Sequence, residues 1–261
     1  MRSSLRIVTW NCRSGPLGQR LSELAEYAPD LVFLQECTPT AGRVTSGVVC
    51  SRRVNSRKGV ALIAAPHACR CRPVRLLRSS GRASVAVTVT APTPFTAIGV
   101  WAQQRDYVGD VVRTIRAHRT LIRDAPAVVM GDFNSGTSLA RPPSQNPSHR
   151  RLLDEFRGLD LVSAYHAFHG IGHGDEAEAT YFHQWNPDRP WHIDFCFIPQ
   201  AWASRLVNVA VIDGASWARR SDHRPLLVEV RLVRSRASRT APRTDNQEPG
   251  TEHRERQNRE P

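Results

Sequence analysis

Residues 127–135, AVVMGDFNS, lead from an apolar strand directly into a carboxylate, an aromatic ring and an amide. The first four residues form a short apolar run, which is typical of a buried strand covered on both faces. We expect Gly131 to allow a tight turn. In an extended chain, Asp132 and Asn134 leave on one side and Phe133 points back. This pair suits a site that activates a water and holds a phosphoryl oxygen, although an Asx turn explains the stretch equally well.

The chain on both sides of this stretch alternates between strand and helix patterns. Period-two or continuous apolar runs predict strands at residues 5–11, 30–36, 59–66, 75–78, 84–90, 95–102, 161–168, 180–183, 191–199, 206–212 and 226–233. Apolar residues at helical spacing predict helices at 17–28 and 107–124, and a short one around 152–156. We expect a loop or hairpin at 43–58 and an exposed, mobile loop at 169–178. The order of these elements indicates an α/β fold.

The composition is that of a soluble globular protein. Of the 261 residues, 40% are hydrophobic and 23% are charged, and no run approaches the roughly 18 apolar residues that span a bilayer. The N-terminus has no apolar core and no cleavage site of a signal peptide, so we expect a cytoplasmic protein with reduced cysteines. We expect it to be a monomer.

Positive charge is concentrated in one part of the chain. The net charge is +12, and residues 37–105 hold eleven Arg or Lys and no Asp or Glu. Lys58 is the only lysine in the chain, so a bias toward arginine explains the residue type but not the missing acids. A surface of one sign attracts phosphate chains or anionic lipid. We therefore expect a nucleic-acid partner that binds this basic block.

The last 28 residues differ from the rest. From Arg234 onward the only apolar residues are two alanines, and Arg, Glu, Thr and Pro predominate. Such a segment has too little apolar surface to form a core. We expect one catalytic domain at residues 1–233 and a disordered tail at residues 234–261.

Polar residues stand at the ends of four predicted strands: Asn11, Glu36, Asp132 with Asn134, and Asp222 with His223. Strand ends are where catalytic residues collect in α/β proteins, and carboxylates gathered from distant segments need a cation among them. Glu36, Asp222 and the Asn11 carbonyl would form an oxygen-rich site suited to Mg²⁺ or Mn²⁺. Asp194 lies inside a predicted strand, where it would orient His223. Each residue alone could be an ordinary surface or turn residue.

The order TWN, LQE, GDFN, HIDF and SDHRP resembles the endonuclease/exonuclease/phosphatase superfamily, which includes DNase I-like nucleases and exonuclease III-type abasic-site endonucleases. These motifs span residues 7 to 225 in the same order and with similar spacing. The resemblance implies a four-layer α/β/β/α sandwich of two packed mixed β-sheets, with a divalent-metal phosphoesterase site at one edge.

The resemblance also implies a role for each matched residue. Asn11, Glu36 and Asp222 would serve a Mg²⁺ or Mn²⁺ ion, and Asn11 could also contact phosphate. Asp132 would orient and deprotonate the attacking water, and Asn134 would hold a non-bridging oxygen. His223, backed by Asp194, would stabilise the charged pentacovalent transition state.

One motif departs from the family pattern. After the strand at 95–100, many members place a His or Tyr near the scissile phosphate, whereas this chain reads Trp101-Ala102-Gln103-Gln104-Arg105. Either Gln103 or Arg105 stabilises the leaving oxygen, or a water in the metal shell supplies the proton. This departure bears on the substrate subclass more than on the reaction.

The sequence therefore predicts a metal-dependent phosphodiester hydrolase, a nuclease acting on DNA or RNA. A phosphomonoesterase or a phospholipid-headgroup phosphodiesterase on the same site is one alternative, because fold does not determine substrate. A non-catalytic nucleic-acid-binding module is the alternative from another class.

Overall fold

We describe a computed structural model of the chain over residues 3–38, 47–75, 77, 80–103, 106–136 and 147–232. The predicted tail at 234–261 and Arg105 lie outside these residues. No helix in the described segments is both long and apolar enough to cross a membrane. All six cysteines are free thiols.

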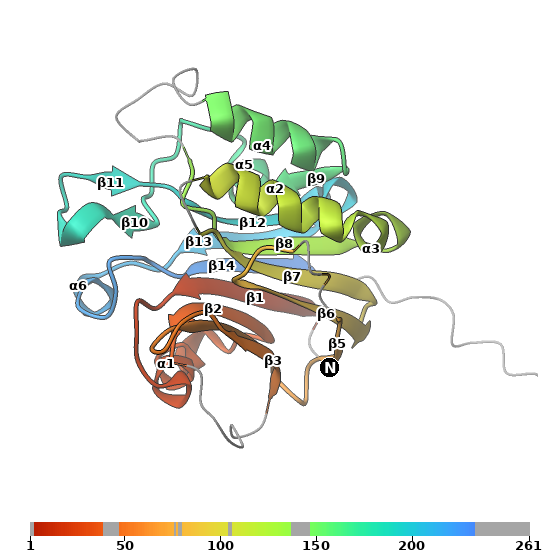
Figure 1. Cartoon of the computed structure of the whole chain (residues 1–261), viewed down its shortest axis with the longest axis horizontal. Helices are drawn as coiled ribbons and strands as arrows, with labels where there is room; N and C mark the ends of the chain where they lie inside the picture. Colours follow the sequence, from red (N-terminus) through yellow and green to blue (C-terminus); the bar gives the residue numbers. More distant parts are fainter. Residues whose placement is uncertain are drawn as a thin grey trace, which may run out of the picture.

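Two six-stranded sheets form the centre of the molecule (Figure 1). The first has the order β13-β14-β1-β2-β4-β3, with β1 (Ser4–Asn11), β2 (Leu31–Cys37), β3 (Val48–Arg53), β4 (Gly59–Ala64), β13 (Leu206–Val211) and β14 (Leu226–Arg231). The second has the order β5-β6-β7-β8-β12-β9, with β5 (Arg70–Pro73), β6 (Ser84–Ala91), β7 (Phe95–Trp101), β8 (Ala127–Asp132), β9 (Leu161–Ser163) and β12 (Asp194–Pro199). Both are mixed, because β1 and β2 are parallel, β7 and β8 are parallel, and the other neighbours are antiparallel.

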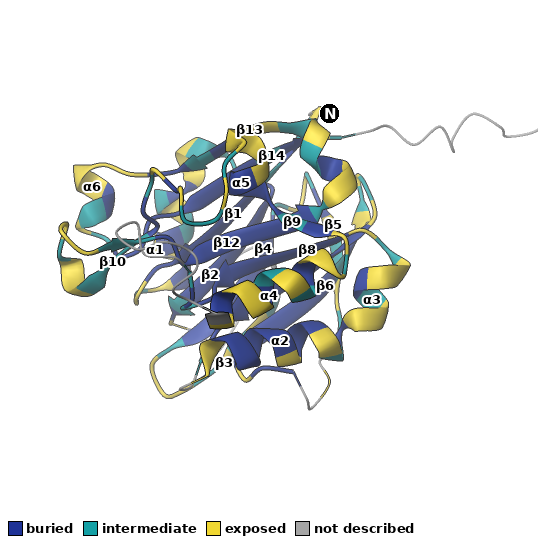
Figure 2. Ribbon diagram, turned by 90° about the horizontal axis from the view of Figure 1, so that it is seen from above, coloured by how far each residue is buried: buried dark blue, intermediate teal, exposed yellow. Residues whose placement is uncertain are grey.

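Helices cover the outer face of each sheet. On the first sheet lie α1 (Leu17–Glu23), η1 (Ala25–Tyr27) and α6 (Ala215–Ala218), and on the second lie α2 (Tyr107–Ala117), α3 (Arg119–Asp124) and α4 (Pro147–Arg157). The remaining elements are α5 (Ala164–His169), η3 (His183–Trp185), η4 (Gln200–Arg205) and a small hairpin of β10 (Tyr181–Phe182) and β11 (Pro190–Trp191). The α/β/β/α sandwich is therefore confirmed. Figure 2 shows the strands buried and the helices exposing their outer faces.

The core lies between the sheets and beneath the helices. Phe33, Met130 and Val228 belong to the cluster that fills the space between the sheets, and all three are 0% exposed. Phe133 points back into the second cluster, where it stacks on Phe156 and Phe197. The prediction that Phe133 faces away from Asp132 and Asn134 is thus confirmed, and its ring anchors the chain beside those polar groups.

Several local expectations were wrong. Gly131 does not make a turn, because β8 continues to Asp132; it is needed because a Cβ there would lie 1.8 Å from the carbonyl oxygen of Val100. The chain reverses at Asn134 instead, which has a φ of 45°. The helix predicted at 107–124 is divided into α2 and α3 at His118.

Three predicted segments also need correction. Residues 161–168 form β9 followed by α5, because the strand pairs with β12 over only three residues. The edge strand lies at 70–73 rather than at 75–78, of which Arg75 and Leu77 are described and are not in a strand. The loop at 169–178 is not uniformly exposed, because Glu176 is only 3% exposed.

Candidate active site

The predicted site residues meet at one edge of the sandwich. The C-terminal ends of β1, β2 and β8 lie at this edge, together with the start of β12 and the turn before β14 (Figure 1). The registers align these ends, since Asp132 pairs with Asp194 and Asn11 pairs with Gln35. Side chains from five segments distant in sequence therefore come together.

Asp132 is at the centre of this group and is 1% exposed. Its Oδ1 accepts a hydrogen bond from the backbone N–H of Asn134 at 2.9 Å. Its Oδ2 accepts from Nδ2 of Asn11 at 2.9 Å and from Nδ2 of Asn134 at 3.2 Å. Burial raises the pKa of Asp132 to about 7, although the neighbouring His223 acts to lower it. A carboxyl group that takes up a proton near neutral pH suits general-base chemistry.

His223 and Asp194 form the predicted pair. Nδ1 of His223 lies 2.8 Å from Oδ2 of Asp194, and the two residues are 5% and 0% exposed. Burial lowers the pKa of His223, but Asp194 and then Asp132 outweigh it and raise the pKa to about 9. Nε2 of His223 lies 3.9 Å from Oδ2 of Asp132, too far for a hydrogen bond. A substrate atom between them could contact both groups.

Asn11 connects Asp132 to the predicted metal ligands. Its Nδ2 also donates to Oε1 of Glu36 at 3.1 Å, and its backbone carbonyl accepts from Oγ of Ser221, next to Asp222, at 2.8 Å. The Oδ1 of Asn11 accepts from the backbone N–H of Arg13 at 3.0 Å. Asn11 therefore lies between Glu36 and the segment that carries Asp222.

Glu36 reaches this site because β2 is irregular there. In the pairing with β4, Gln35 is opposite Val60 and Cys37 is opposite Gly59, so Glu36 is an extra residue with a φ of 59°. Such a bulge turns one side chain out of the regular alternation.

The two carboxylates at this edge each contact a basic side chain. Nζ of Lys58 contacts Oε2 of Glu36, and Nη1 of Arg13 lies 2.5 Å from Oδ2 of Asp222. Both carboxylates are largely buried, with side chains 17% and 11% exposed, so they need a neighbouring positive charge. Two carboxylates and an amide oxygen are the hard ligands that Mg²⁺ and Mn²⁺ prefer. The chemistry of these side chains therefore fits a divalent ion, and the Asn11 amide would turn to offer its oxygen, because its NH₂ group now faces Glu36.

Asn134 and Gln103 lie on the side of the site next to β7. The Nδ2 of Asn134 donates to the carbonyl of Ala102 at 3.2 Å, and the Nε2 of Gln103 donates to the same carbonyl at 3.3 Å. The backbone N–H of Gln103 is held by Oδ2 of the buried Asp110 at 3.0 Å. Gln103 thus lies beside Asn134.

Sequence reasoning missed four residues that shape this edge: Arg13, Lys58, Tyr181 and Ser221. The ring of Tyr181 lies 4.4 Å from that of His223, and Oγ of Ser221 accepts from the backbone N–H of His223 at 3.0 Å. Ser221 could have been found, because it stands in the SDHRP motif. Lys58 stands out in the sequence as the only lysine of the chain, but nothing in the sequence links it to Glu36.

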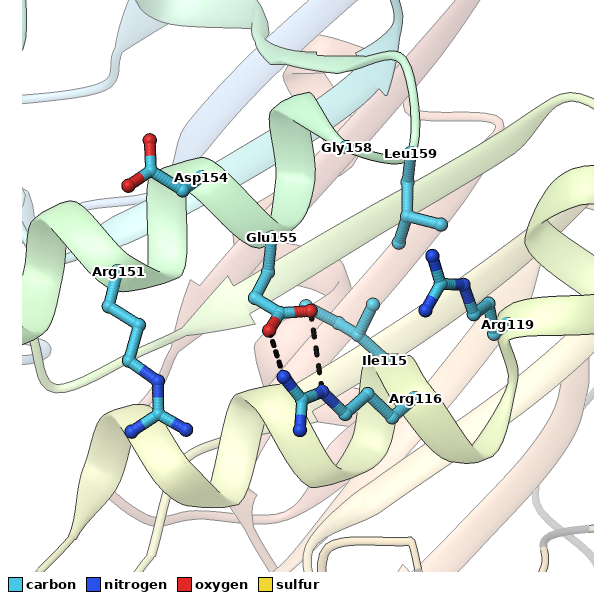
Figure 3. A pocket seen from close by; sticks show the side chains of 8 residues that line it. All are labelled: Ile115, Arg116, Arg119, Arg151, Asp154, Glu155, Gly158 and Leu159. Carbon is cyan, nitrogen blue, oxygen red and sulfur yellow. Dashed lines mark hydrogen bonds and ion pairs between the residues drawn. The ribbon is translucent and has the colours of Figure 1, made fainter.

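A separate cavity lies between α2 and α4, away from the strand ends (Figure 3). It has a volume of about 210 Å³ and contains the ion pair between Arg116 and Glu155. No titratable group in it is strongly buried, so we assign no chemistry to this cavity.

Comparison with known families decides the classification. The family described as "Endonuclease/Exonuclease/phosphatase family" matches residues 8–223. The chain belongs to this family. As a member of the endonuclease/exonuclease/phosphatase family it is grouped with nucleases and phosphatases, which are phosphoester hydrolases. No protein among the curated sequences matches the chain.

Solved structures of the same fold support this classification. An AP endonuclease from Archaeoglobus fulgidus has a TM-score of 0.65 at 17% identity, over 86% of this chain and 98% of that chain. A 3'-5' exonuclease (NExo) from Neisseria meningitidis has a TM-score of 0.64 at 21% identity, over 87% of this chain and 100% of that chain. The endonuclease domain of TRAS1, a telomere-specific non-LTR retrotransposon, has a TM-score of 0.65 at 14% identity, over 88% of this chain and 99% of that chain. At these identities the likeness shows the shared fold.

Proposed function

We propose that this member of the family is a divalent-metal-dependent phosphodiester hydrolase that acts on nucleic acid. The observation that carries the proposal is the buried group of Asp132, Asn11, and the Asp194–His223 pair at the edge where Glu36 and Asp222 also lie. Asp132 as a buried base and the His223 imidazole as a buried hydrogen-bond donor are the two kinds of group that attack of water on phosphorus requires.

In the proposed mechanism Asp132 takes the proton from the attacking water. Its Oδ1 is held by the backbone N–H of Asn134 and its Oδ2 by the amide of Asn11, so the carboxylate is oriented before substrate binds. The raised pKa of Asp132 lets it accept the proton near neutral pH.

His223 donates a hydrogen bond from Nε2 to a non-bridging oxygen as negative charge develops on the phosphoryl group. Asp194 keeps Nδ1 protonated and the ring oriented, because the two atoms lie 2.8 Å apart. Asn134 offers its amide to a second non-bridging oxygen, and Gln103, which bonds the same Ala102 carbonyl as Asn134, would interact with the leaving oxygen.

Glu36, Asp222 and Asn11 would hold the divalent ion. When bound there, such an ion supplies positive charge that stabilises the phosphoryl oxygens and the leaving group. Magnesium and manganese both match this set of oxygen ligands.

The basic block supports a nucleic-acid substrate. Its described arginines lie mainly on β3, β5 and the turn that leads to Lys58, and β3 contacts β5 across the two sheets. Arg53, Arg57, Arg70 and Arg72 are exposed there. Arg53 and Arg57 lie at the end of β3 and β4 that is next to Glu36, whereas Arg70 and Arg72 lie at the opposite end of the second sheet. Exposed guanidinium groups beside the site match a phosphate backbone better than a small phosphoester.

An exposed aromatic residue adds to this support. Trp185 is 41% exposed, has a φ of 63°, and lies 5.0 Å from the guanidinium carbon of Arg13, which contacts Asp222. Exposed tryptophan rings beside cationic groups are platforms on which nucleobases stack. One structure of the same fold is described as a 3' phosphatase from Neisseria bound to product DNA hairpin.

An activity panel tests the proposal. Plasmid DNA, abasic duplex, RNA and para-nitrophenyl phosphate would each be incubated with Mg²⁺, Mn²⁺ or EDTA. We expect cleavage of a nucleic acid that EDTA abolishes. Cleavage of para-nitrophenyl phosphate alone would favour the phosphomonoesterase, and nucleic-acid binding without cleavage under every metal condition would favour the binding module.

A Trp185→Ala variant extends this panel. We expect it to weaken binding of single-stranded DNA by about 5- to 100-fold, because one base–aromatic stack contributes about 1–3 kcal/mol. Turnover of para-nitrophenyl phosphate should stay unchanged, so the two readouts separate base stacking from damage to the site.

A further inference from the structure

A second cluster of titratable side chains lies outside the candidate active site. His166 on α5, and His173 and Glu176 on the loop that follows it, each place one ligand atom within 4.8 Å of the others. Nε2 of His166 lies 2.9 Å from Oε1 of Glu176. The rings of His166 and His173 lie 6.2 and 5.9 Å from that of Phe195 on β12.

Two imidazole nitrogens of this cluster are buried without a partner among the described residues. One is Nδ1 of His173, which belongs to the triad itself. The other is Nε2 of His192, a residue that is 0% exposed and whose ring centroid lies 5.9 Å from that of His166. Burying an unsatisfied polar atom is costly, so the cluster lacks a group that these nitrogens would bind.

The tautomer of His192 shows what kind of group is missing. Its Nδ1 lies 2.9 Å from the carbonyl oxygen of Glu178, which can only accept, so Nδ1 carries the proton. In the neutral imidazole with this tautomer, Nε2 presents a lone pair. A lone pair in this setting binds either a hydrogen-bond donor or a metal ion.

The composition of the cluster favours a metal ion. The side chain of Glu176 is 0% exposed, and its Oε1 lies 2.9 Å from Nε2 of His166. A buried carboxylate beside imidazole nitrogens is a donor set that metal ions bind.

The donor set and its spacing fit zinc. Tetrahedral zinc, with bonds of about 2.0–2.2 Å to imidazole nitrogen and carboxylate oxygen, places its ligand atoms about 3.4 Å apart. The ligand atoms of the triad lie within 4.8 Å of one another. The rings of His166 and His173 are stacked with centroids 3.5 Å apart, so one ring would turn to direct its nitrogen at the shared ion. Nδ1 of His166 lies 2.7 Å from Oγ of Ser163, the kind of contact that orients a metal-binding imidazole.

We propose that His166, His173 and Glu176 bind a zinc ion, with His192 offering a further nitrogen. This site is separate from the carboxylates at the strand ends and does not depend on the proposed hydrolase activity. The ion would tie the loop at residues 170–180 to α5.

This loop leads directly to the candidate active site. It ends at Thr180, whose Oγ1 accepts the backbone N–H groups of Ile193 and Asp194, both at 3.0 Å. The carbonyl of Thr180 also accepts the backbone N–H of Arg224, next to His223, at 2.7 Å. A zinc ion in the loop would therefore stabilise the segment that supports the Asp194–His223 pair.

Zinc titration of the full chain tests the proposal. The protein would be stripped with a chelator, dialysed, and titrated with ZnCl₂ by calorimetry in excess Mg²⁺, which occupies oxygen-ligand sites. We expect one zinc ion per chain. Binding of Co²⁺ should give the visible absorption bands of a tetrahedral ion with nitrogen ligands. No zinc binding under these conditions would overturn the proposal.

Variants assign the site. His173→Ala removes a loop ligand and should weaken zinc binding by more than the 10- to 100-fold typical of residues that only orient a ligand. Glu176→Gln tests the anionic ligand. His169→Ala is the matched control, because His169 is an exposed residue of the same helix.

Zinc affinity in His169→Ala should equal that of the wild type. Near-ultraviolet circular dichroism checks that each variant is folded, and Glu36→Gln should keep both the zinc ion and the cobalt spectrum. A folded His173→Ala protein that binds zinc with wild-type affinity would overturn the assignment. So would cobalt bands that disappear in Glu36→Gln but persist in His173→Ala.

Discussion

Replacing Asp132 with Asn removes the proposed proton acceptor and keeps nearly the same shape. Asp132 is 1% exposed and accepts hydrogen bonds from Asn134 and Asn11. In the variant one carboxylate oxygen becomes an NH₂ group, so one of these donors loses its acceptor, at a cost of about 1–3 kcal/mol. The variant also no longer buries an ionised group, which offsets part of this cost. We therefore expect a folded protein with a slightly changed melting temperature.

The effect on turnover should be far larger than the effect on stability. General-base catalysis contributes about 10²- to 10⁴-fold, and the loss should approach 10⁴-fold, about 5 kcal/mol in the barrier, because this carboxylate also positions the water. The assay is steady-state cleavage of the best substrate of the panel, with kcat falling and KM nearly unchanged. Asp124→Asn, which changes an exposed carboxylate at the C-terminal end of α3, is the matched control. A folded Asp132→Asn protein within a few-fold of wild-type kcat, with metal binding intact, would refute the mechanism.

Four further predictions follow from other parts of the molecule. Glu36→Gln should weaken Mg²⁺ binding and raise the Mg²⁺ concentration for half-maximal activity; an unchanged metal dependence would remove Glu36 from the site. Nucleic-acid affinity should fall with salt at a slope of about −0.9 per phosphate contacted on duplex DNA, and a flat response would point to a small substrate. Truncation after Val233 should leave melting temperature and turnover unchanged; loss of folding would show that the tail docks. Burial lowers the pKa of His118, so stability should fall as pH drops below about 6.5, the unfolded value, and melting curves of His118→Gln should show a smaller fall.

The fold could be predicted from sequence because its signals are local. The site residues stand in or next to short apolar runs, and the five motifs come in a characteristic order. The same patterns placed Asp132 beside Asn134 and paired Asp194 with His223. Local signals failed where a tertiary contact decides the conformation. The break at His118 is one example, since its Nε2 contacts Oγ of Ser80 from a distant segment.

The contacts of the two metal-site carboxylates show why part of the site was not predictable. Lys58 is 22 residues from Glu36, and Arg13 is 209 residues from Asp222, so no periodicity connects either pair. The histidine cluster likewise draws His192 and His166 together from separate elements. A sequence motif identifies residues that lie at the same strand end. Side-chain contacts between residues distant in sequence form only when the two sheets pack together, so a motif does not reveal them.

The basic partners of Glu36 and Asp222 connect metal binding with substrate binding. Each carboxylate already has a cationic neighbour, so an ion held by both must share or displace the contacts with Lys58 and Arg13. These side chains are 35% and 45% exposed, so both can turn toward solvent. Because Arg13 also contacts the exposed Trp185, a displaced guanidinium would stay at the mouth of the site, where a phosphate chain would enter. The same positive charge that balances the carboxylates without metal would then attract the substrate.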